Sequence, residues 1–415
     1  MTPAARPVPA SVIVVSRHRA EALRLCLTAL GQQDHPEFEV IVVADPAGIA
    51  AAQATGLPLR LVAFDEANIS AARNAGLALA GAPVVAFIDD DACAEPTWLS
   101  RLTAPFADAA VGAATGFVRG RNGISLQWGV ARVDGAGRDH PFSLPDAGGV
   151  FAPGDGRVIK TQGTNCAFRR DALLAAGGFD PAFRFYLDEV DVNLRMQAVT
   201  AVVPLAQVVH GFAESARRRA DRVPLSLHDI GASSTCLWRR HMPGGNIAAE
   251  VARLLAAQAD RLQALSGAGR IGAEAAARLM QSLRDGLDEG GQRPIPLPPP
   301  IAAASGFAPL PGTGPRAGRL IAGRVWQRRR LIEAARQAVA AGEVVTVLCL
   351  SPTARPHWHR LHPDGFWLQE GGLFGRALRQ GPRLRLWTFA RRVAAERARL
   401  AGCRPLDHGE TAEIG

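Results

Sequence analysis

Strand-like and helix-like hydrophobic patterns alternate along the first 120 residues of the chain. Four continuous apolar runs rich in β-branched residues predict buried strands at 11–16, 38–45, 59–64 and 84–88. Leucines at helical spacing predict a helix over 19–31, and Asn68 is placed to cap a second helix that ends at Gly81. Buried strands that alternate with helices are typical of a mostly parallel sheet covered on both faces, so the pattern predicts an α/β fold.

The rest of the chain changes character several times. Mixed patterns occupy 110–225, and amphipathic helical stretches occupy 225–290. Residues 294–315 hold eight of the 29 prolines, which predicts an extended linker without packed structure. A helix around 318–341 and a strand over 344–351 are expected to open a small C-terminal α/β module. We therefore predict a first domain, a helical extension, a Pro-rich linker and a basic C-terminal module, over 1–225, 226–293, 294–316 and 317–415.

Size and composition restrict the class of protein. With 415 residues and 48% hydrophobic content, the chain suffices for two or three domains with a sizeable core, which excludes wholesale disorder. The sequence contains no run of about 18 apolar residues, so no membrane-spanning helix is predicted. The first ten residues lack the apolar middle of a secretory signal. The six cysteines are scattered without a CxxC pair, which disfavours a zinc cluster or a disulfide framework and favours a cytoplasmic location.

Positive charge is concentrated in the last quarter of the chain. The whole sequence has 47 basic and 38 acidic residues, a formal net charge of +9, and Lys160 is its only lysine. Residues 1–240 carry 23 basic and 24 acidic side chains, whereas residues 301–415 carry 18 basic and eight acidic ones. Such a tail favours an anionic partner, namely membrane phosphate, nucleic acid or an acidic substrate, and the simpler alternative is a solvated Arg-rich surface.

Two common nucleotide-binding motifs do not occur in the sequence. No GxGxxG follows the first predicted strand, and no GxxxxGK[ST] occurs, which disfavours a dinucleotide-binding fold and a P-loop nucleotidase. A nucleotidyltransferase would need a lysine in a Gly-rich loop near the N-terminus, whereas the one lysine is at position 160. In a parallel sheet, ligands bind beyond the carboxyl ends of the strands, so functional residues are expected there.

Acidic side chains follow two of the predicted strands. Asp45 comes after the second strand, and Asp89, Asp90 and Asp91 come after the fourth. Two carboxylates two residues apart at a turn can bind one hard divalent cation, which can in turn hold a diphosphate leaving group. The alternative is a helix N-terminus, because acidic residues also favour that end of the helix expected near 96–98.

A second acidic group opens a further predicted helix. Asp188 and Asp191 lie on one face of it, and Asp191 can pair with Arg195 four residues later. Glu189 points elsewhere, so it is a candidate general base, and the alternative is a first-turn acid favoured by the helix dipole. His210 ends an apolar run and is either a structural residue or a metal ligand.

Four segments, in order, resemble the family 2 glycosyltransferases, which have the GT-A fold. SVIVVSRHR resembles the first nucleotide-binding strand of the family, and NISAARNAGLALAGAPVVAFIDDDACAEPTWL resembles the stretch leading into its metal-binding DxD motif. GTNCAFRRDALLAAGGFD resembles the acceptor-side segment, and YLDEVDVNLRM resembles the catalytic ED motif. The resemblance covers about residues 10–215 and implies a GT-A-type sheet there, while the C-terminal region stays unassigned.

The resemblance implies inverting transfer of a hexosyl or deoxyhexosyl group from a nucleotide-diphosphate sugar to a hydroxyl of a glycan or lipid-linked glycan. Asp89 and Asp91 fall on the DxD positions that hold Mg²⁺ or Mn²⁺, and His210 falls near a third ligand position. Asp188 and Glu189 fall on the catalytic pair, which here reads Asp-Glu instead of Glu-Asp, so either acid is a candidate base. The substrate-binding residues predicted in this way are Ser16, Arg17, Asp45, Asn68, Arg73, Asp89, Asp90, Gly163, Thr164, Asn165 and Asp191.

An alternative is a catalytically silent sugar- or nucleic-acid-binding protein that keeps the fold, for which the swapped Asp-Glu pair leaves room. No RRM, KH or helix-turn-helix signature occurs, so nucleic acid is not the expected partner. Residues 355–376 concentrate aromatic and histidine side chains, which either stack on sugars or form the core of a small domain. Arg-rich helical stretches at 323–337 and 389–400 favour peripheral contact with an anionic membrane, at the inner face of the cell membrane.

Overall fold

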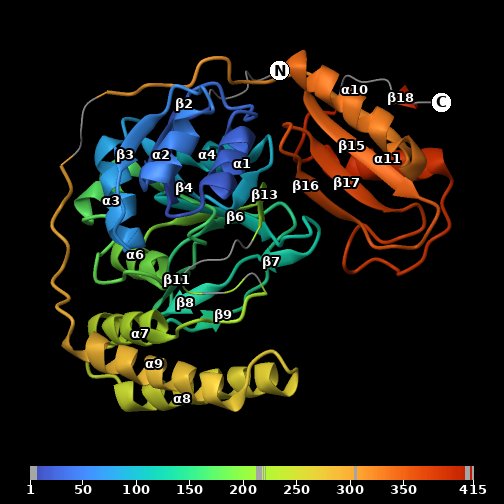
Figure 1. Cartoon of the computed structure of the whole chain (residues 1–415). Helices are drawn as coiled ribbons and strands as arrows, with labels where there is room; N and C mark the ends of the chain where they lie inside the picture. Colours follow the sequence, from blue (N-terminus) through green and yellow to red (C-terminus); the bar gives the residue numbers. More distant parts are fainter. Residues whose placement is uncertain are drawn as a thin grey trace.

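A mixed sheet forms the centre of the N-terminal domain. The computed structural model describes residues 7–415 except 212–216, 218, 220, 303–305, 407–411 and 414–415. One half of the sheet is parallel and has the strand order β3-β2-β1-β4 (Figure 1). These strands are β1 (Ala10–Ser16), β2 (Phe38–Ala44), β3 (Arg60–Ala63) and β4 (Val84–Asp89). All four carboxyl ends therefore meet at one edge of the sheet.

The other half of the sheet mixes strand directions. β12 lies antiparallel between β4 and β6, and β13 runs parallel to β6. β10 pairs with the start of β13, β5 pairs with its end, and β7 pairs with the end of β6. These strands are β5 (Ala92–Ala94), β6 (Ala113–Arg119), β7 (Leu126–Trp128), β10 (Gly149–Phe151), β12 (Cys166–Arg169) and β13 (Thr200–His210). In this register His210 lies opposite Ala92, beside the acids that follow β4.

Helices cover both faces of the sheet, which confirms the predicted α/β fold class. One face is covered by α1 (Ala20–Leu30), α2 (Pro46–Gln53) and α4 (Trp98–Thr103), and the other by α3 (Ile69–Leu79), α5 (Arg170–Ala175) and α6 (Asp188–Met196). Asn68 caps α3 as predicted, and its side-chain oxygen accepts a hydrogen bond from the Ala71 amide. The sequence pattern does not indicate α2, because its alanine-rich sequence has little hydrophobic periodicity.

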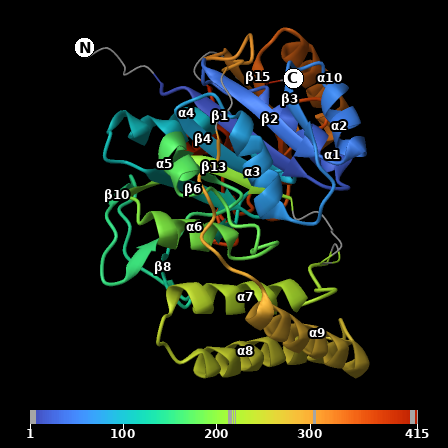
Figure 2. The same cartoon turned by 90° about the vertical axis from the view of Figure 1, so that its left-hand side faces the viewer.

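A small sheet and three helices extend the domain beyond α6. The sheet has the order β11-β8-β9, and it packs with α6 and α7 around Val133, Val158 and Leu237. Its strands are β8 (Arg132–Asp134), β9 (Asp139–His140) and β11 (Arg157–Ile159). The helices are α7 (His228–His241), α8 (Ile247–Gly267) and α9 (Ala273–Gln292), which pack around one core at the end of the molecule away from β1–β3 (Figure 2).

The Pro-rich segment after α9 passes back along the first domain, as the orange trace of Figure 1 shows. Its described residues form neither helix nor strand, but the expectation that they are unpacked is wrong. The amide of Ile301 donates to the Leu174 carbonyl at 3.1 Å, and buried Leu310 donates to the Phe38 carbonyl at 2.8 Å. Apolar side chains between the prolines explain the packing, because they cover the ends of both hydrophobic cores.

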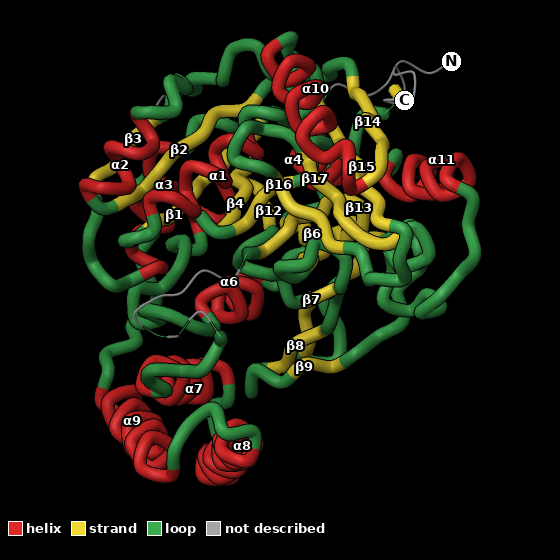
Figure 3. Tube along the Cα trace, turned by 45° about the vertical axis from the view of Figure 1, so that its right-hand side comes forward, coloured by secondary structure: helices red, strands yellow, loops and turns green. Residues whose placement is uncertain are grey.

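The C-terminal module is a separate five-stranded sheet with one helix on each face (Figure 3). Its strand order is β16-β17-β15-β14-β18, and only β16 runs antiparallel to its neighbour among the described strands. Residues 318–324 form a strand here, which corrects the expected helix around 318–341; the helix begins at Arg328. The physical reason is that Leu320, Ile321 and Ala322 are all buried within the sheet. The elements are β14 (Gly318–Arg324), α10 (Arg328–Ala340), β15 (Val344–Ser351), β16 (Trp358–Leu361), β17 (Trp367–Gly372), α11 (Phe389–Leu400) and β18 (Ala412–Glu413).

Several composition-based expectations have a structural counterpart. All six cysteines are free and buried. Among the described residues, no helix has both the length and the apolar character that crossing a bilayer requires. Phe366 and Trp367 lie in the core of the C-terminal module, whereas Trp358 is half-buried at its edge.

Candidate active site

Functional side chains gather at the carboxyl edge of the parallel strands. β1 ends at Ser16, β2 is followed by Asp45, and β4 ends at Asp89. The Ser16 hydroxyl donates a 2.6 Å hydrogen bond to Asp90 Oδ2, and Arg19 Nη2 lies 2.5 Å from Asp90 Oδ1. The first strand end and the acidic turn are therefore joined directly.

The three consecutive acids have different environments. Asp89 is the most exposed, with 29% of its side chain accessible, while the side chains of Asp90 and Asp91 are almost fully buried. The pKa of Asp90 is raised to about 7. Burial is the main cause, the charges of Asp91 and Asp89 act in the same direction, and Arg19 opposes the shift. Asp90 therefore anchors Arg19 and the first strand, and leaves its two neighbours to face the site.

Asp89, Asp91 and His210 converge on one point. One possible ligand atom of each lies within 4.8 Å of the others, and His210 Nε2 is 3.0 Å from Asp91 Oδ1. On the opposite side of the ring, Nδ1 lies 3.3 Å from Gln127 Oε1, and Trp128 packs on the imidazole with ring centroids 5.7 Å apart. An amide oxygen at Nδ1 keeps a proton there, which leaves the Nε2 lone pair for a cation. Two carboxylates and one imidazole thus fit the predicted divalent metal.

Arg73 connects the two acidic groups that the sequence places about 100 residues apart. Its buried guanidinium contacts Asp188 through Nη1, while Nη2 lies 3.4 Å from Asp89 Oδ1 and donates to the Gly163 carbonyl at 3.0 Å. The same guanidinium lies 5.1 Å from the ring centroid of Phe179. A fixed cation between the acids reduces their mutual repulsion and holds α3, β4 and α6 in register.

Glu189 lies in the first turn of α6 and differs from its neighbour Asp188. Asp188 is buried against Arg73, whereas Glu189 is partly exposed. Burial and the charge of Asp188 raise the pKa of Glu189 to about 8, and the cations of Lys160 and Arg73 act in the opposite direction. Tyr186 precedes the helix with a φ of 74°, in the left-handed region, so the turn that presents Glu189 is a strained one. The structure therefore distinguishes a carboxylate that is paired from one that can exchange a proton.

The acceptor-side segment is largely built into the sheet. The Asn165 side chain accepts from Trp98 Nε1 at 2.7 Å and donates to the carbonyls of Phe117 and Ala206 at 3.0 and 2.8 Å. Asn165 is fully buried, and Thr164 is 2% exposed. Of the predicted residues 163–165, only Gly163 is brought to the site directly, through its carbonyl on Arg73.

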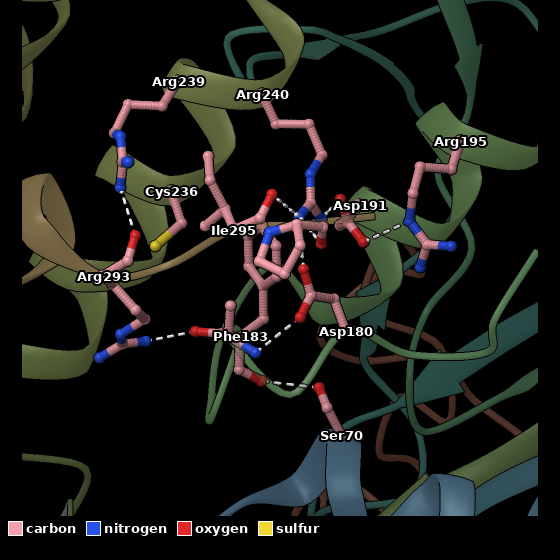
Figure 4. A network of polar contacts seen from close by, with 12 residues as sticks. Ser70, Asp180, Phe183, Asp191, Arg195, Cys236, Arg239, Arg240, Arg293 and Ile295 are labelled. Atoms are coloured by element: carbon pink, nitrogen blue, oxygen red, sulfur yellow. Dashed lines mark hydrogen bonds and ion pairs between the residues drawn. The ribbon is translucent and has the colours of Figure 1, made fainter. Parts of the chain in front are cut away.

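Asp191 belongs to a buried ion-pair cluster that joins α6 to α7 (Figure 4). Its carboxylate lies 2.7 Å from Arg195 Nε, 2.9 Å from Arg240 Nη1 and 2.9 Å from His241 Nε2. Burial alone would raise the pKa of Asp191, but the His241 hydrogen bond and the two arginines hold it below its usual value. The structure thus places Asp191 among protein cations and away from Asp89, although both were predicted to bind substrate.

Two further predicted substrate residues, Asp45 and Arg17, directly follow β2 and β1. Asp45 caps α2 and accepts from the amides of His18 at 2.8 Å and Ala47 at 3.2 Å. Burial opposes ionisation, yet these hydrogen bonds hold the pKa of Asp45 below its usual value. Arg17 is half-buried, and its Nε lies 2.8 Å from Asp65 Oδ1.

The sequence did not single out Arg19, Gln127 or Trp128 as site residues. Arg19 follows the first strand, so its position was a usable signal. Gln127 and Trp128 come from a stretch of mixed pattern, and only the pairing of β7 with β6 brings them to His210. No sequence signal could have identified these two residues.

The fold and the site define an α/β domain with a group of two carboxylates and one imidazole at the strand ends, which fits a divalent cation. Residues 11–174 match the family model for Glycosyl transferase family 2. The predicted resemblance to family 2 glycosyltransferases is thereby confirmed for this part of the chain. The matched segment contains Asp89 and Asp91 and ends before Glu189 and His210.

The chain is also similar to individual proteins. The chain is 28% identical over 229 residues to the O-antigen biosynthesis protein RfbC of Myxococcus xanthus, an alignment that covers 52% of this chain and 18% of RfbC. Among solved structures, S. aureus TarS 1–349 in complex with UDP is 17% identical with a TM-score of 0.42, covering 74% of this chain and 99% of TarS 1–349. The mannosyltransferase PcManGT of Pyrobaculum calidifontis, in complex with GDP-Man and Mn²⁺, is 18% identical with a TM-score of 0.42, covering 70% of this chain and 89% of PcManGT.

Proposed function

We propose that the protein is an inverting glycosyltransferase that moves a hexosyl or deoxyhexosyl group from a nucleotide-diphosphate sugar to an acceptor hydroxyl. The observation that carries the proposal is the arrangement around Arg73. This side chain contacts Asp89 of the metal-binding group on one side and Asp188, next to Glu189, on the other. An in-line displacement at a sugar carbon needs a cation at the leaving group and a base on the opposite face. A divalent ion at Asp89 and Asp91 and the carboxylate of Glu189 would supply these two groups.

Asp89, Asp91 and His210 would hold the divalent ion, which neutralises the diphosphate as it leaves. Gln127 fixes the His210 tautomer, and the buried Arg73 adds a further positive charge to the site. Cations in a dry site stabilise developing phosphate charge more strongly than they would in water.

Glu189 is the proposed base on the acceptor side. The acceptor oxygen attacks the anomeric carbon, and its proton moves to a Glu189 oxygen. The electron pair of the anomeric carbon–oxygen bond leaves with the nucleoside diphosphate, and the configuration at carbon inverts. Asp188 keeps Arg73 in place, so it acts as a positioning residue in this scheme.

The decisive experiment measures release of nucleoside diphosphate from a panel of nucleotide sugars with Mn²⁺ or Mg²⁺ and glycan acceptors. Asp91→Ala and Glu189→Gln are expected to abolish release, whereas Asp171→Asn, at a carboxylate that is 88% exposed on α5, serves as the control. Unchanged release in both site variants would refute the assignment. Donor binding without turnover across the panel would favour the silent binding protein instead.

We further propose that the acceptor is a glycan or lipid-linked glycan, which the name of the O-antigen biosynthesis relative supports. A loop between β17 and α11 presents Leu384 and Leu386, which are 59% and 83% exposed. Five arginines and no acidic residue lie in the surrounding stretch 376–391. Exposed leucines among arginines suit an anionic lipid surface, which offers both an apolar layer and negative charge.

Co-sedimentation with liposomes tests this membrane contact. The wild-type chain is expected to bind phosphatidylglycerol vesicles at low salt and not to bind phosphatidylcholine vesicles. Leu386→Glu should weaken binding, while Leu297→Glu, at a linker leucine that is 74% exposed, should leave it unchanged. Equal binding by both variants, or no binding by the wild type, contradicts the membrane proposal alone.

A further inference from the structure

The C-terminal module contacts the first domain directly beside the metal-binding group. Figure 1 shows the module, in orange and red, against the side of the sheet that carries β13. Arg404 forms two hydrogen bonds with Glu95, at 2.6 Å from Nε and 2.8 Å from Nη2. Both side chains are almost fully buried, and Glu95 directly follows β5, four residues after Asp91.

The environment of this ion pair fixes its geometry. The Arg404 guanidinium lies 4.2 Å from the Trp367 ring centroid and donates to Thr346 at 3.3 Å. His359 lies 3.6 Å from Glu95, and burial together with nearby arginines lowers the pKa of its imidazole well below the usual value. Because His359 is therefore neutral, Arg404 is the cation that balances Glu95.

An apolar contact also joins the module to the paired strands β5 and β13. Cys93 of β5 and Val209 of β13 are register partners, and both pack in one buried cluster with Leu361 and Trp367 of the module. Cys93 comes two residues after Asp91, and Val209 immediately precedes the third ligand. The strand that follows Asp91 and the strand that ends at His210 are thus held by one surface of the module.

A third contact joins the module to the turn before β7, the strand that packs against His210. The His359 amide donates to the Asn122 carbonyl at 2.9 Å, and Gly123 lies so close that an added Cβ would be 2.2 Å from the His359 ring. This turn leads into β7, whose Gln127 and Trp128 contact the imidazole of His210. Among the described residues, the module therefore touches Glu95 and Cys93 after Asp91, Val209 before His210, and the turn at Asn122 that leads to β7.

We propose that the C-terminal module positions the metal-binding group, and that Arg404 is the principal positioning residue. The proposal rests on the proposed function and adds a role for the basic region that the family match leaves unexplained. A small set of ligands on separate segments binds a cation tightly only when those segments are held in place, and loss of such outer contacts typically lowers metal affinity about 10- to 100-fold.

The positioning role of Arg404 is tested by measuring the affinity of the full chain for Mn²⁺ in the absence of donor. The EPR signal of free Mn²⁺ reports the unbound fraction. Arg404→Met is expected to raise the dissociation constant about 10- to 100-fold. Arg319→Met removes another bidentate arginine–glutamate pair, with Glu343 inside the module, and should change affinity less than twofold. Transfer by the Arg404 variant should recover at saturating Mn²⁺, because the ligands themselves remain.

Two further measurements guard against a folding defect. Glu95→Gln keeps a hydrogen-bond acceptor for Arg404 and replaces the Met variant if that protein does not fold. The buried Cys93 and Cys403 thiols should become reactive to a thiol reagent in either variant well below the unfolding temperature. Wild-type Mn²⁺ affinity in both variants overturns the positioning role and leaves the transferase proposal intact. A wild-type chain that neither binds Mn²⁺ nor releases nucleotide refutes both proposals.

Discussion

Glu189 as the base predicts a definite pH dependence of sugar transfer. Its pKa of about 8 means that only about one tenth of the molecules carry the ionised carboxylate at pH 7, and about nine tenths at pH 9. A base acts in its ionised form, so the rate should rise with pH, by about tenfold between pH 7 and pH 9. Glu189→Gln removes the base and should lower the rate about 10²- to 10⁴-fold across the range.

The charged groups around Glu189 allow a sharper test. Those that face it come from several elements, namely Asp188 and Tyr186 at the start of α6, Arg73 of α3, Cys166 of β12 and Lys160 after β11. Lys160 Nζ also lies 2.9 Å from Asp139 Oδ1. Removing this cation in Lys160→Met should raise the Glu189 pKa and move the ascending limb to higher pH, while Lys160→Arg should leave the limb in place.

The assay is kcat/KM for the acceptor, measured from pH 6 to 9.5 with saturating donor and Mg²⁺. An ascending limb near pH 8 that moves upward in Lys160→Met, and not in Lys160→Arg, is the expected result. A flat profile with full loss of activity in Glu189→Gln would contradict the pKa argument. Substantial activity in Glu189→Gln would exclude Glu189 as the base and leave Asp188 as the candidate.

Three further predictions concern the metal and the buried network. His210→Ala should raise the dissociation constant of Mn²⁺ at least about tenfold, because one of three ligands is lost, as calorimetric titration can show. Asp191→Asn should cost about 3–5 kcal/mol of unfolding free energy, since Arg195 would lose its carboxylate partner while staying buried and Arg240 would be left with Asp180. The folded-state pKa of Asp191 is lowered, so its contribution is present above about pH 4 and lost as pH falls; denaturation curves of wild type and variant should therefore converge in acid. Asn165→Ala should cost at least about 2 kcal/mol in the same assay, because buried backbone carbonyls lose their donor.

Local pattern determined the elements and the approximate positions of the chemistry. The β-branched runs and leucine spacing were sufficient for β1 to β4, α1 and α3, because the periodicity of burial is written into neighbouring residues. The acids at 89–91 and 188–191 could be singled out because like charges in series are hard to explain by stability alone. The packing of the linker and the strand β14 were predicted wrongly, because proline content and a short apolar run do not reveal what a segment packs against.

Tertiary structure decided how those residues divide their roles. Asp188, Glu189 and Asp191 look alike in sequence, yet one pairs with Arg73, one carries a raised pKa, and one is buried among arginines. Arg73, the partner of Asp188, is 115 residues away along the chain, and Arg240, a partner of Asp191, is 49 residues away. Docking of Arg404 on Glu95 joins residues 309 positions apart. Contacts over such separations arise from packing of whole elements, and no local periodicity encodes them.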